Sequence, residues 1–258
     1  MMKRTIATIA ALVAAVGLVS CSSDRFDKIP QNTGFFQHLQ KNPYKEVPVD
    51  AYWVSEKYTE KEWDQRVDGE NAQGVCLRLT PVTLDYLVNR PADAKEMAEI
   101  QSLRQYLDDA LQKELRKVSD DPKNNFHLVQ KNGPGVLTVE VAILSVKTAI
   151  IGKNAAMKAV GVVTGIVGSV ATRALGDSED KGHICIAARI KDSSGRVVSE
   201  SAKYMTGQSS LLGYDTKDFR KYAHQRASID DWVKMVGKSC IVRSDEKITM
   251  PRFKLNPF

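Results

Sequence analysis

The stretch ICIAARIKDSSGRVVSESAKYM, residues 184–205, decides the fold of this chain. In its first half, apolar residues at even positions alternate with other residues at odd positions, as Ile184, Ile186, Ala188 and Ile190 do with Cys185, Ala187 and Arg189. A period of two is typical of a β-strand with one buried face. The turn Asp192-Ser193-Ser194-Gly195 follows, and residues 196–205 return as a second strand. The stretch therefore predicts a β-hairpin.

A second alternating stretch lies upstream, at residues 136–148. Here apolar Leu137, Val139, Val141 and Ile143 alternate with Thr138, Glu140 and Ala142. Shorter strands are expected at residues 51–54, 75–79 and 126–129, and the strand at 75–79 is expected to continue as another at 82–87. The sheet is expected to be rich in hairpins and mostly antiparallel.

One long amphipathic helix is expected after Asn89 and Pro91, a cap-like residue and a first-turn proline. Apolar residues then recur at steps of three or four: Met97, Ile100, Leu103, Leu107, Leu111, Leu115 and Val118. This spacing puts them on one stripe of a helix, which we interpret as a core face rather than a partner-binding face.

Two further helical stretches are predicted near the C-terminus, at residues 217–223 and 228–238. The second begins at Ser228, which resembles the start of a capping box because Asp231 follows three residues later. Its apolar residues are Ile229, Trp232, Val233 and Val236. The predicted fold class is α+β, with the long helix and the C-terminal helix packed on the sheet.

The first residues have the pattern of an export signal. Lys3 and Arg4 precede an uncharged apolar run at residues 6–19, which is too short for a secure transmembrane helix. The run ends in Leu18-Val19-Ser20-Cys21, which resembles the lipobox recognised by lipoprotein signal peptidase. Cleavage before Cys21 would leave a thiol that can carry a thioether-linked diacylglycerol, whereas an ordinary signal peptide would need no cysteine there.

This interpretation divides the chain into four parts. Residues 1–20 are the expected lipoprotein signal peptide, and residues 21–47 are the lipidated cysteine and a tether. Within the tether, Phe35, Phe36 and Leu39 are expected to form a local apolar anchor. Residues 48–242 are expected to form a single α+β domain, and residues 243–258 a polar tail. The residue after Cys21 is Ser22 rather than the aspartate that retains enterobacterial lipoproteins at the inner membrane. The expected location is therefore the outer membrane, facing mainly the periplasm.

Composition is that of a globular protein, with 43% hydrophobic and 26% charged residues. Removal of Lys3 and Arg4 from the 37 basic residues leaves 35 against 31 acidic ones, a net charge near +4. A mild excess spread along the chain does not indicate nucleic acid as a partner.

A stretch rich in glycine and other small residues, 155–176, lies between two predicted strands. Gly161 and Gly165 are four apart, the spacing that lets helices approach closely in lipid, and Gly168 follows. The uncharged part, 159–172, has only fourteen residues, short of the roughly 20 that span a bilayer. Two interpretations stay open, namely contact with a membrane surface or another copy, and a tightly packed buried segment.

No catalytic or metal-binding signature is found, and no cofactor is expected. His183 and Cys185 are two apart on a strand and could form half of a metal or thiolate site. No third ligand lies nearby in the sequence, and an exposed strand face is the simpler explanation of the pair. Gly237-Lys238-Ser239 lacks the earlier glycine of a phosphate-binding loop, because Trp232 stands there. Asp230-Asp231 is interpreted as helix capping.

Three further cysteines, Cys76, Cys185 and Cys240, follow Cys21. In an oxidising periplasm two of them could pair and one would be left over. The sequence does not choose between the pairings.

The layout resembles the bacterial lipoproteins grouped as domain of unknown function family 3313. The resemblance lies in Thr33-Gly34-Phe35-Phe36 with Leu39, residues 75–82 ending in Thr80-Pro81-Val82, Gly133-Pro134-Gly135-Val136-Leu137, the small residues of 160–176, residues 184–198 and the helix of Trp232. Residues 56–73 depart from it as a polar insertion. The resemblance implies an envelope location and no established activity.

The expected function is that of a non-enzymatic, lipid-anchored binding or assembly module. Its partners would be the membrane, through the lipid on Cys21, and an envelope protein or a second copy of the chain. Two alternatives stay open: a pore- or secretion-associated lipoprotein that uses residues 155–175, and an enzyme with an unrecognised site.

Overall fold

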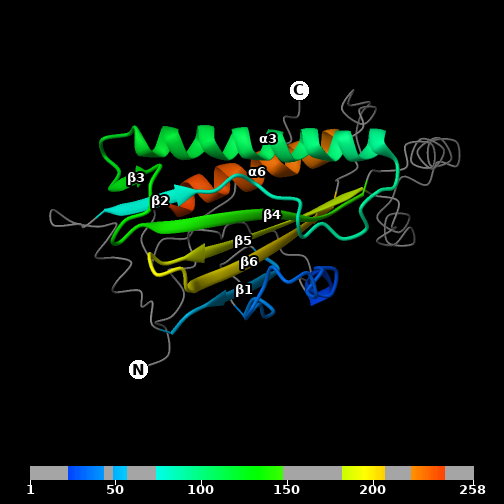
Figure 1. Cartoon of the computed structure of the whole chain (residues 1–258), viewed down its shortest axis with the longest axis horizontal. Coiled ribbons are helices and arrows are strands. Elements are labelled where there is room, and N and C mark those ends of the chain that lie inside the picture. Colours follow the sequence, from blue (N-terminus) through cyan, green and yellow to red (C-terminus); the bar gives the residue numbers. More distant parts are fainter. Residues whose placement is uncertain (1–22, 44–48, 57–73, 148–181, 207–221, 242–258) are drawn as a thin grey trace, which may run out of the picture.

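A computed structural model describes residues 23–43, 49–56, 74–147, 182–206 and 222–241 (Figure 1). Several expectations lie outside these residues. They are the lipobox Leu18, Val19, Ser20 and Cys21, the glycines Gly161, Gly165 and Gly168, most of the predicted helix 217–223, and the tail 243–258.

The described elements are three helices and six strands. They are α1 (Ser23–Phe26), β1 (Ala51–Val54), β2 (Val75–Leu79), α3 (Ala94–Ser119), β3 (Phe126–Leu128), β4 (Leu137–Lys147), β5 (His183–Lys191), β6 (Val197–Thr206) and α6 (Ala223–Ser239). The strands form one sheet in the order β1-β6-β5-β4-β2-β3. Both long helices lie on the same side of it (Figure 1). The α+β class is therefore confirmed.

The β5–β6 hairpin is confirmed, with antiparallel pairing along its length. Asp192 explains why the chain turns where it does. One carboxylate oxygen accepts hydrogen bonds from the Ser194 amide and hydroxyl and from the Arg196 amide, and the other accepts from the Arg196 guanidinium. Gly195 has a φ of +83°, which suits glycine. Burial tends to raise the pKa of Asp192, but these hydrogen bonds outweigh it and leave the pKa below its ordinary value.

The expectation of a mostly antiparallel sheet is wrong, because the sheet is mixed. β2 runs parallel to both β3 and β4. The physical reason is α3, which carries the chain back along the sheet between β2 and β3, so that β3 must start at the same end as β2. Residues 82–87 are not a strand either. They contribute a single bridge, from Thr83 to Ala142.

The helix α3 begins later than predicted. Its N-cap is Asp93, whose carboxylate accepts hydrogen bonds from the amides of Lys95 and Glu96, whereas Asn89 lies in the left-handed region upstream. Six of the seven predicted stripe residues are buried: Ile100, Leu103, Leu107, Leu111, Leu115 and Val118. Met97 is only partly buried.

The helix α6 begins five residues before the predicted start. The predicted cap at Ser228 is therefore wrong, and the residue before the helix is Tyr222, with a φ of 65°. The predicted burial of Ile229, Trp232, Val233 and Val236 is confirmed. A Cβ added to Gly237 would lie 2.7 Å from Cγ of Glu114 on α3, so glycine permits the close approach of the two helices.

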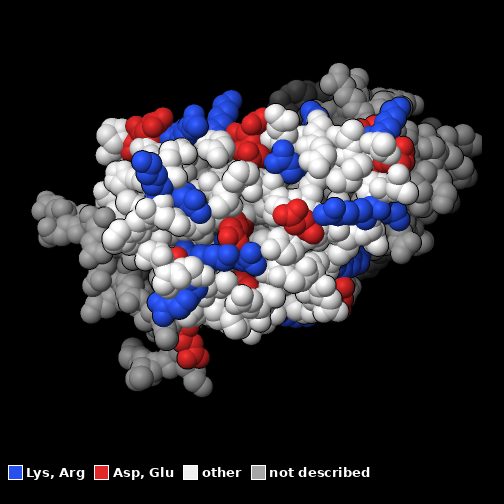
Figure 2. Space-filling view, in the orientation of Figure 1, with Lys and Arg blue, Asp and Glu red and all other residues white. Residues whose placement is uncertain are grey.

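Lys, Arg, Asp and Glu side chains are interspersed on the face of the molecule seen in Figure 2. No described helix combines the length and apolarity that a membrane crossing needs.

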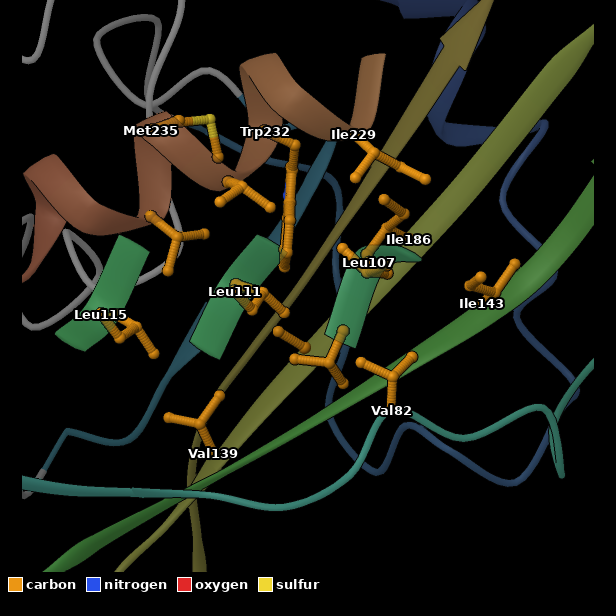
Figure 3. Close-up of a cluster of buried hydrophobic side chains, with 14 of the residues drawn as sticks. Val82, Leu107, Leu111, Leu115, Val139, Ile143, Ile186, Ile229, Trp232 and Met235 are labelled. Atoms are coloured by element: carbon orange, nitrogen blue, oxygen red, sulfur yellow. The ribbon is translucent and has the colours of Figure 1, made fainter. Parts of the chain in front are cut away.

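The main core fills the space between the helices and the sheet. Trp232 points from α6 toward Leu111 of α3 and the strands beneath (Figure 3). A cavity of about 10 Å³ lies here, lined by residues that include Trp232, Leu115 and Val139. Since a single water needs a space of about this size, this layer is close to fully packed.

Candidate functional site

The face of the sheet that points away from the helices, which we call the second face, is covered by the chain's own N-terminal segment. A separate buried cluster marks the contact: Ile29, Phe35, Ala51, Ala142, Leu144, Cys185, Ala187, Ala202 and Tyr204. Phe36 and Leu39 pack against it, so the predicted local anchor is part of the folded structure. Less of residues 21–47 is therefore available as a tether than the sequence suggests.

Small side chains make room for this segment. Ala142, Ala187, Ala202 and Ala51 are successive register partners across β4, β5, β6 and β1, and none is more than 2% exposed. Phe35, which is fully buried, belongs to the same cluster. Methyl groups leave room beside these four strands. Side chains from residues 26–43, the segment before β1 that we call the lead-in, pack into that room.

Next to the alanine row lies a row of charged and aromatic residues. Glu140, Arg189, Glu200 and Trp53 are register partners on the same four strands. Arg189 donates from Nη1 to the carbonyl oxygen of Phe35 at 2.7 Å and from Nε to Glu140. Its guanidinium carbon lies 4.6 Å from the centroid of the Phe35 ring, within the range of a cation–π contact.

Glu200 binds the next two residues of the lead-in. It is 0% exposed, and its two carboxylate oxygens accept hydrogen bonds from the amides of Gln37 and His38, each at 2.8 Å. The His38 ring stacks on Trp53 with ring centroids 4.2 Å apart. Arg189, Glu200 and Trp53 together form what we call the lead-in clasp, which holds residues 35–38 mainly through backbone groups.

The charges around the clasp favour the ionised forms. Burial tends to raise the pKa of Glu140, but hydrogen bonds from Lys191 and Arg189 and their positive charges outweigh it, so the pKa lies below its ordinary value. Burial tends to lower the pKa of Arg189, and its contacts with Glu140 and Tyr86 reverse that direction. The guanidinium therefore stays charged where it contacts Phe35.

A second polar group lies at the other end of β6. The carboxylate of Asp50 accepts hydrogen bonds from the Tyr204 amide at 2.8 Å and from Lys203 Nζ at 3.5 Å. Burial lowers the pKa of Lys203 despite the attraction of Asp50. The carboxylate has a structural role, since it joins the chain just before β1 to the end of β6.

His183 and Cys185 share the second face, but the expectation of an exposed strand face is wrong. Cys185 is fully buried, and burial raises the pKa of its thiol well above the ordinary value. Burial and the charges of Lys147 and Lys28 lower the pKa of His183 to about 4, so its imidazole is neutral at pH 7. Among the described residues no three metal-binding side chains lie together. A buried neutral thiol is a poor nucleophile and a poor metal ligand.

We predict that alkylation of the native protein will distinguish its cysteines. Cys76 is half-buried, whereas Cys185 and Cys240 are buried. Iodoacetamide at pH 8 should therefore modify Cys76 first and leave the other two intact until the chain is unfolded in guanidinium. Peptide mass spectrometry before and after unfolding measures this order. Modification of Cys185 as fast as Cys76 in the folded protein would contradict the burial described above.

The other cysteine, glycine and aspartate motifs of the sequence have structural roles. Cys76, Cys185 and Cys240 are all free thiols. Gly237-Lys238-Ser239 ends α6, whereas a phosphate-binding loop begins a helix. Asp230 and Asp231 lie inside α6, so their interpretation as capping residues is wrong. The Tyr106 hydroxyl donates to Asp230 at 2.6 Å, which fastens α3 to α6.

Arg189 and Glu200 were not predicted from the sequence as residues that act on the lead-in. One signal was present, because the odd positions of 184–190 are Cys, Ala and Arg rather than the uniformly polar residues of a solvent-facing strand. That pattern indicates a second covered face. It does not reveal what covers it.

Comparison with known proteins gives one clear result. A family described as "Protein of unknown function (DUF3313)" matches residues 56–235. The match includes residues 56–73, which the sequence resemblance left out, and the sheet residues of the clasp at 189 and 200. It does not reach residues 33–39.

No curated protein matches the chain. Among solved structures, a dodecameric PelC from Paraburkholderia phytofirmans is similar at 11% identity, over 64% of this chain and 86% of that one. The TM-score is 0.29, too low to support a conclusion about fold or function. The family match covers most of the chain, and this protein therefore belongs to the DUF3313 family of proteins of unknown function.

Proposed function

We propose that this protein is a lipid-anchored module of the bacterial cell envelope, attached through Cys21 to the periplasmic side of the outer membrane. Its role is to hold a folded domain at the membrane, where it binds an envelope protein or a second copy of itself. The observation that carries the proposal is the lead-in clasp, in which buried Glu200 and half-buried Arg189 hold the backbone of residues 35–38.

The clasp supports an anchoring role for a physical reason. Any displacement of the lipid relative to the domain must be transmitted through the segment that follows Cys21. A buried carboxylate with two hydrogen bonds from backbone amides, beside a guanidinium bound to a carbonyl, resists such displacement better than apolar contacts alone. Domain and anchor then move together.

We propose that the module is not an enzyme. Among the described side chains of the second face, Cys185 and His183 are neutral, and Arg189 and Glu200 are engaged with the lead-in. The mixed charges seen in Figure 2 fit a protein partner better than nucleic acid, which needs a surface of one sign.

The test is metabolic labelling with an alkyne analogue of palmitate, combined with separation of inner and outer membranes. We expect the native protein to carry the label and to sediment with the outer membrane. Cys21→Ala should lose the label, and the matched variant Cys76→Ala should keep it. Ser22→Asp should keep the label and move to the inner membrane.

Two outcomes would contradict the proposal. Equal labelling of the Cys21→Ala variant and the native protein would exclude Cys21 as the lipid site. An unlabelled native protein that is released with the soluble periplasmic fraction would exclude the anchor altogether.

A further inference from the structure

One end of the sheet gathers basic side chains close to the start of the lead-in. Lys147 ends β4 and is the register partner of His183, which begins β5. The His183 ring lies 4.9 Å from the Tyr204 ring, and Lys28 Nζ lies 5.9 Å from the centroid of the same Tyr204 ring. Lys147 and Lys28 therefore approach one another around Tyr204, although they are far apart in sequence.

The charge at this end is mainly positive among the described residues. Lys28 and Lys147 are exposed, and Arg25 is half-buried one turn before Lys28. The same segment carries two acids, Asp24 and Asp27, and Asp27 is exposed. The other nearby carboxylate, Asp50, is hydrogen-bonded to Lys203. Three basic residues, Arg25, Lys28 and Lys147, which we call the basic end, thus stand against the two acids of this segment.

The basic end is fixed to the sheet. The amide of Lys28 donates to the carbonyl of Arg25, and that of Ile29 to Phe26, each at 3.1 Å. Ile29 is only 3% exposed and belongs to the cluster on the second face. The lysine and arginine therefore keep their places relative to Tyr204.

The length of chain before the basic end limits where the membrane can be. Cys21 precedes Arg25 by four residues. Four fully extended residues span at most about 14 Å, and the lipid-bearing sulfur lies at the bilayer surface. Arg25 is therefore held within roughly one to two Debye lengths of the headgroups, and Lys28 follows it by three residues. At that range lysine and arginine attract anionic lipids measurably.

We propose that the basic end of the sheet is the membrane-facing end, and that Arg25, Lys28 and Lys147 contact the phosphate groups of anionic phospholipids in the leaflet that carries the lipid of Cys21. This inference rests on the proposed anchoring function. It adds an orientation, because the domain then stands with the ends of β4 and β6 and the start of β5 toward the bilayer. The opposite end of the sheet faces away from it.

The first test uses photocrosslinking with the full native lipoprotein, purified in detergent and reconstituted into vesicles of phosphatidylethanolamine and phosphatidylglycerol. The phosphatidylglycerol carries a diazirine on its headgroup. We expect crosslinked peptides to contain residues 25–28 and 147, and not the exposed surface of α3. The palmitate label is read on the same sample.

The two readouts separate the two proposals. A labelled protein whose crosslinks fall on α3, or spread evenly over the surface, would overturn the orientation and leave the anchor standing. An unlabelled protein would overturn both. A labelled protein with crosslinks at the basic end supports both.

A second test measures charge directly. A Cys21→Ala chain made without residues 1–20 lacks both the acyl anchor and the apolar signal, so its binding to vesicles depends on surface contacts. The change Lys28→Gln together with Lys147→Gln should weaken its binding to phosphatidylglycerol vesicles by about fivefold for each lysine. The matched pair Lys113→Gln and Lys131→Gln, also exposed, should leave binding unchanged. Equal losses in the two pairs would overturn the proposal, and circular dichroism checks that both remain folded.

Discussion

Replacing Trp232 with alanine should destabilise the protein strongly, by about 3–5 kcal/mol. The indole is 2% exposed and joins α6 to α3 and to the sheet (Figure 3). Removing it leaves a void that the packed layer around it, with its cavity of only about 10 Å³, cannot absorb by small shifts. For a domain of this size the melting temperature should fall by about 6–20 °C.

Thermal and urea unfolding followed by circular dichroism measure this effect. Trp232→Phe is the matched control, since it keeps an aromatic ring and should cost clearly less than alanine. Ile229→Val, also in α6 and fully buried, should cost about 1 kcal/mol. A loss at Trp232→Ala no larger than at Ile229→Val would mean that α6 does not close the core as described.

Replacing Glu200 with alanine should release the lead-in, at a cost of about 2–4 kcal/mol. Two hydrogen bonds to a charged group are lost, and the amides of Gln37 and His38 are left without this acceptor. Glu200→Gln should cost less, because the amide oxygen still accepts one bond while its NH₂ faces a second donor. Hydrogen exchange at residues 37 and 38 should become fast in the alanine variant.

The same experiment contains its own control. Glu114→Ala on α3 removes a half-buried carboxylate that pairs with Lys117 at 4.0 Å, and exchange at residues 37 and 38 should not change. If the amides of residues 37 and 38 exchange as slowly in Glu200→Ala as in the unaltered chain, the clasp is not what holds the segment.

Much of the fold follows from local patterns in the sequence. The β5–β6 hairpin and β4 were predicted because a period of two and a turn are properties of neighbouring residues. The parallel pairing of β2 with β3 and β4 was not, because strand direction depends on where α3 returns the chain. The predicted starts of α3 and α6 were also wrong. Asp93, an equally good cap residue, precedes α3 in place of Asn89, and the left-handed Tyr222 precedes α6 although Ser228 is the better cap residue by type.

The clasp could not be predicted in the same way. Glu200 lies 163 positions from Gln37, so no spacing in the sequence connects them. Its neighbours Ser199 and Ser201 make the strand look solvent-facing, whereas Glu200 is fully buried. The hydrogen-bond acceptor of Arg189 and the donors to Glu200 on the lead-in are backbone groups, which every residue possesses. The Phe35 ring also contacts Arg189, but a phenylalanine in a sequence does not indicate which cation it will meet.

The alanine row has a consequence for how relatives of this protein are recognised. Positions 51, 142, 187 and 202 are scattered along the chain, yet they act as one steric unit because a larger side chain at any of them would lift Phe35 and its neighbours off the sheet. Positions 142, 187 and 202 lie inside the residues that the family model matches, whereas residues 33–39 of the covering lead-in lie outside them. A relative that keeps small residues at all four positions should therefore carry a comparable aromatic segment ahead of its first strand, even where pairwise alignment finds none.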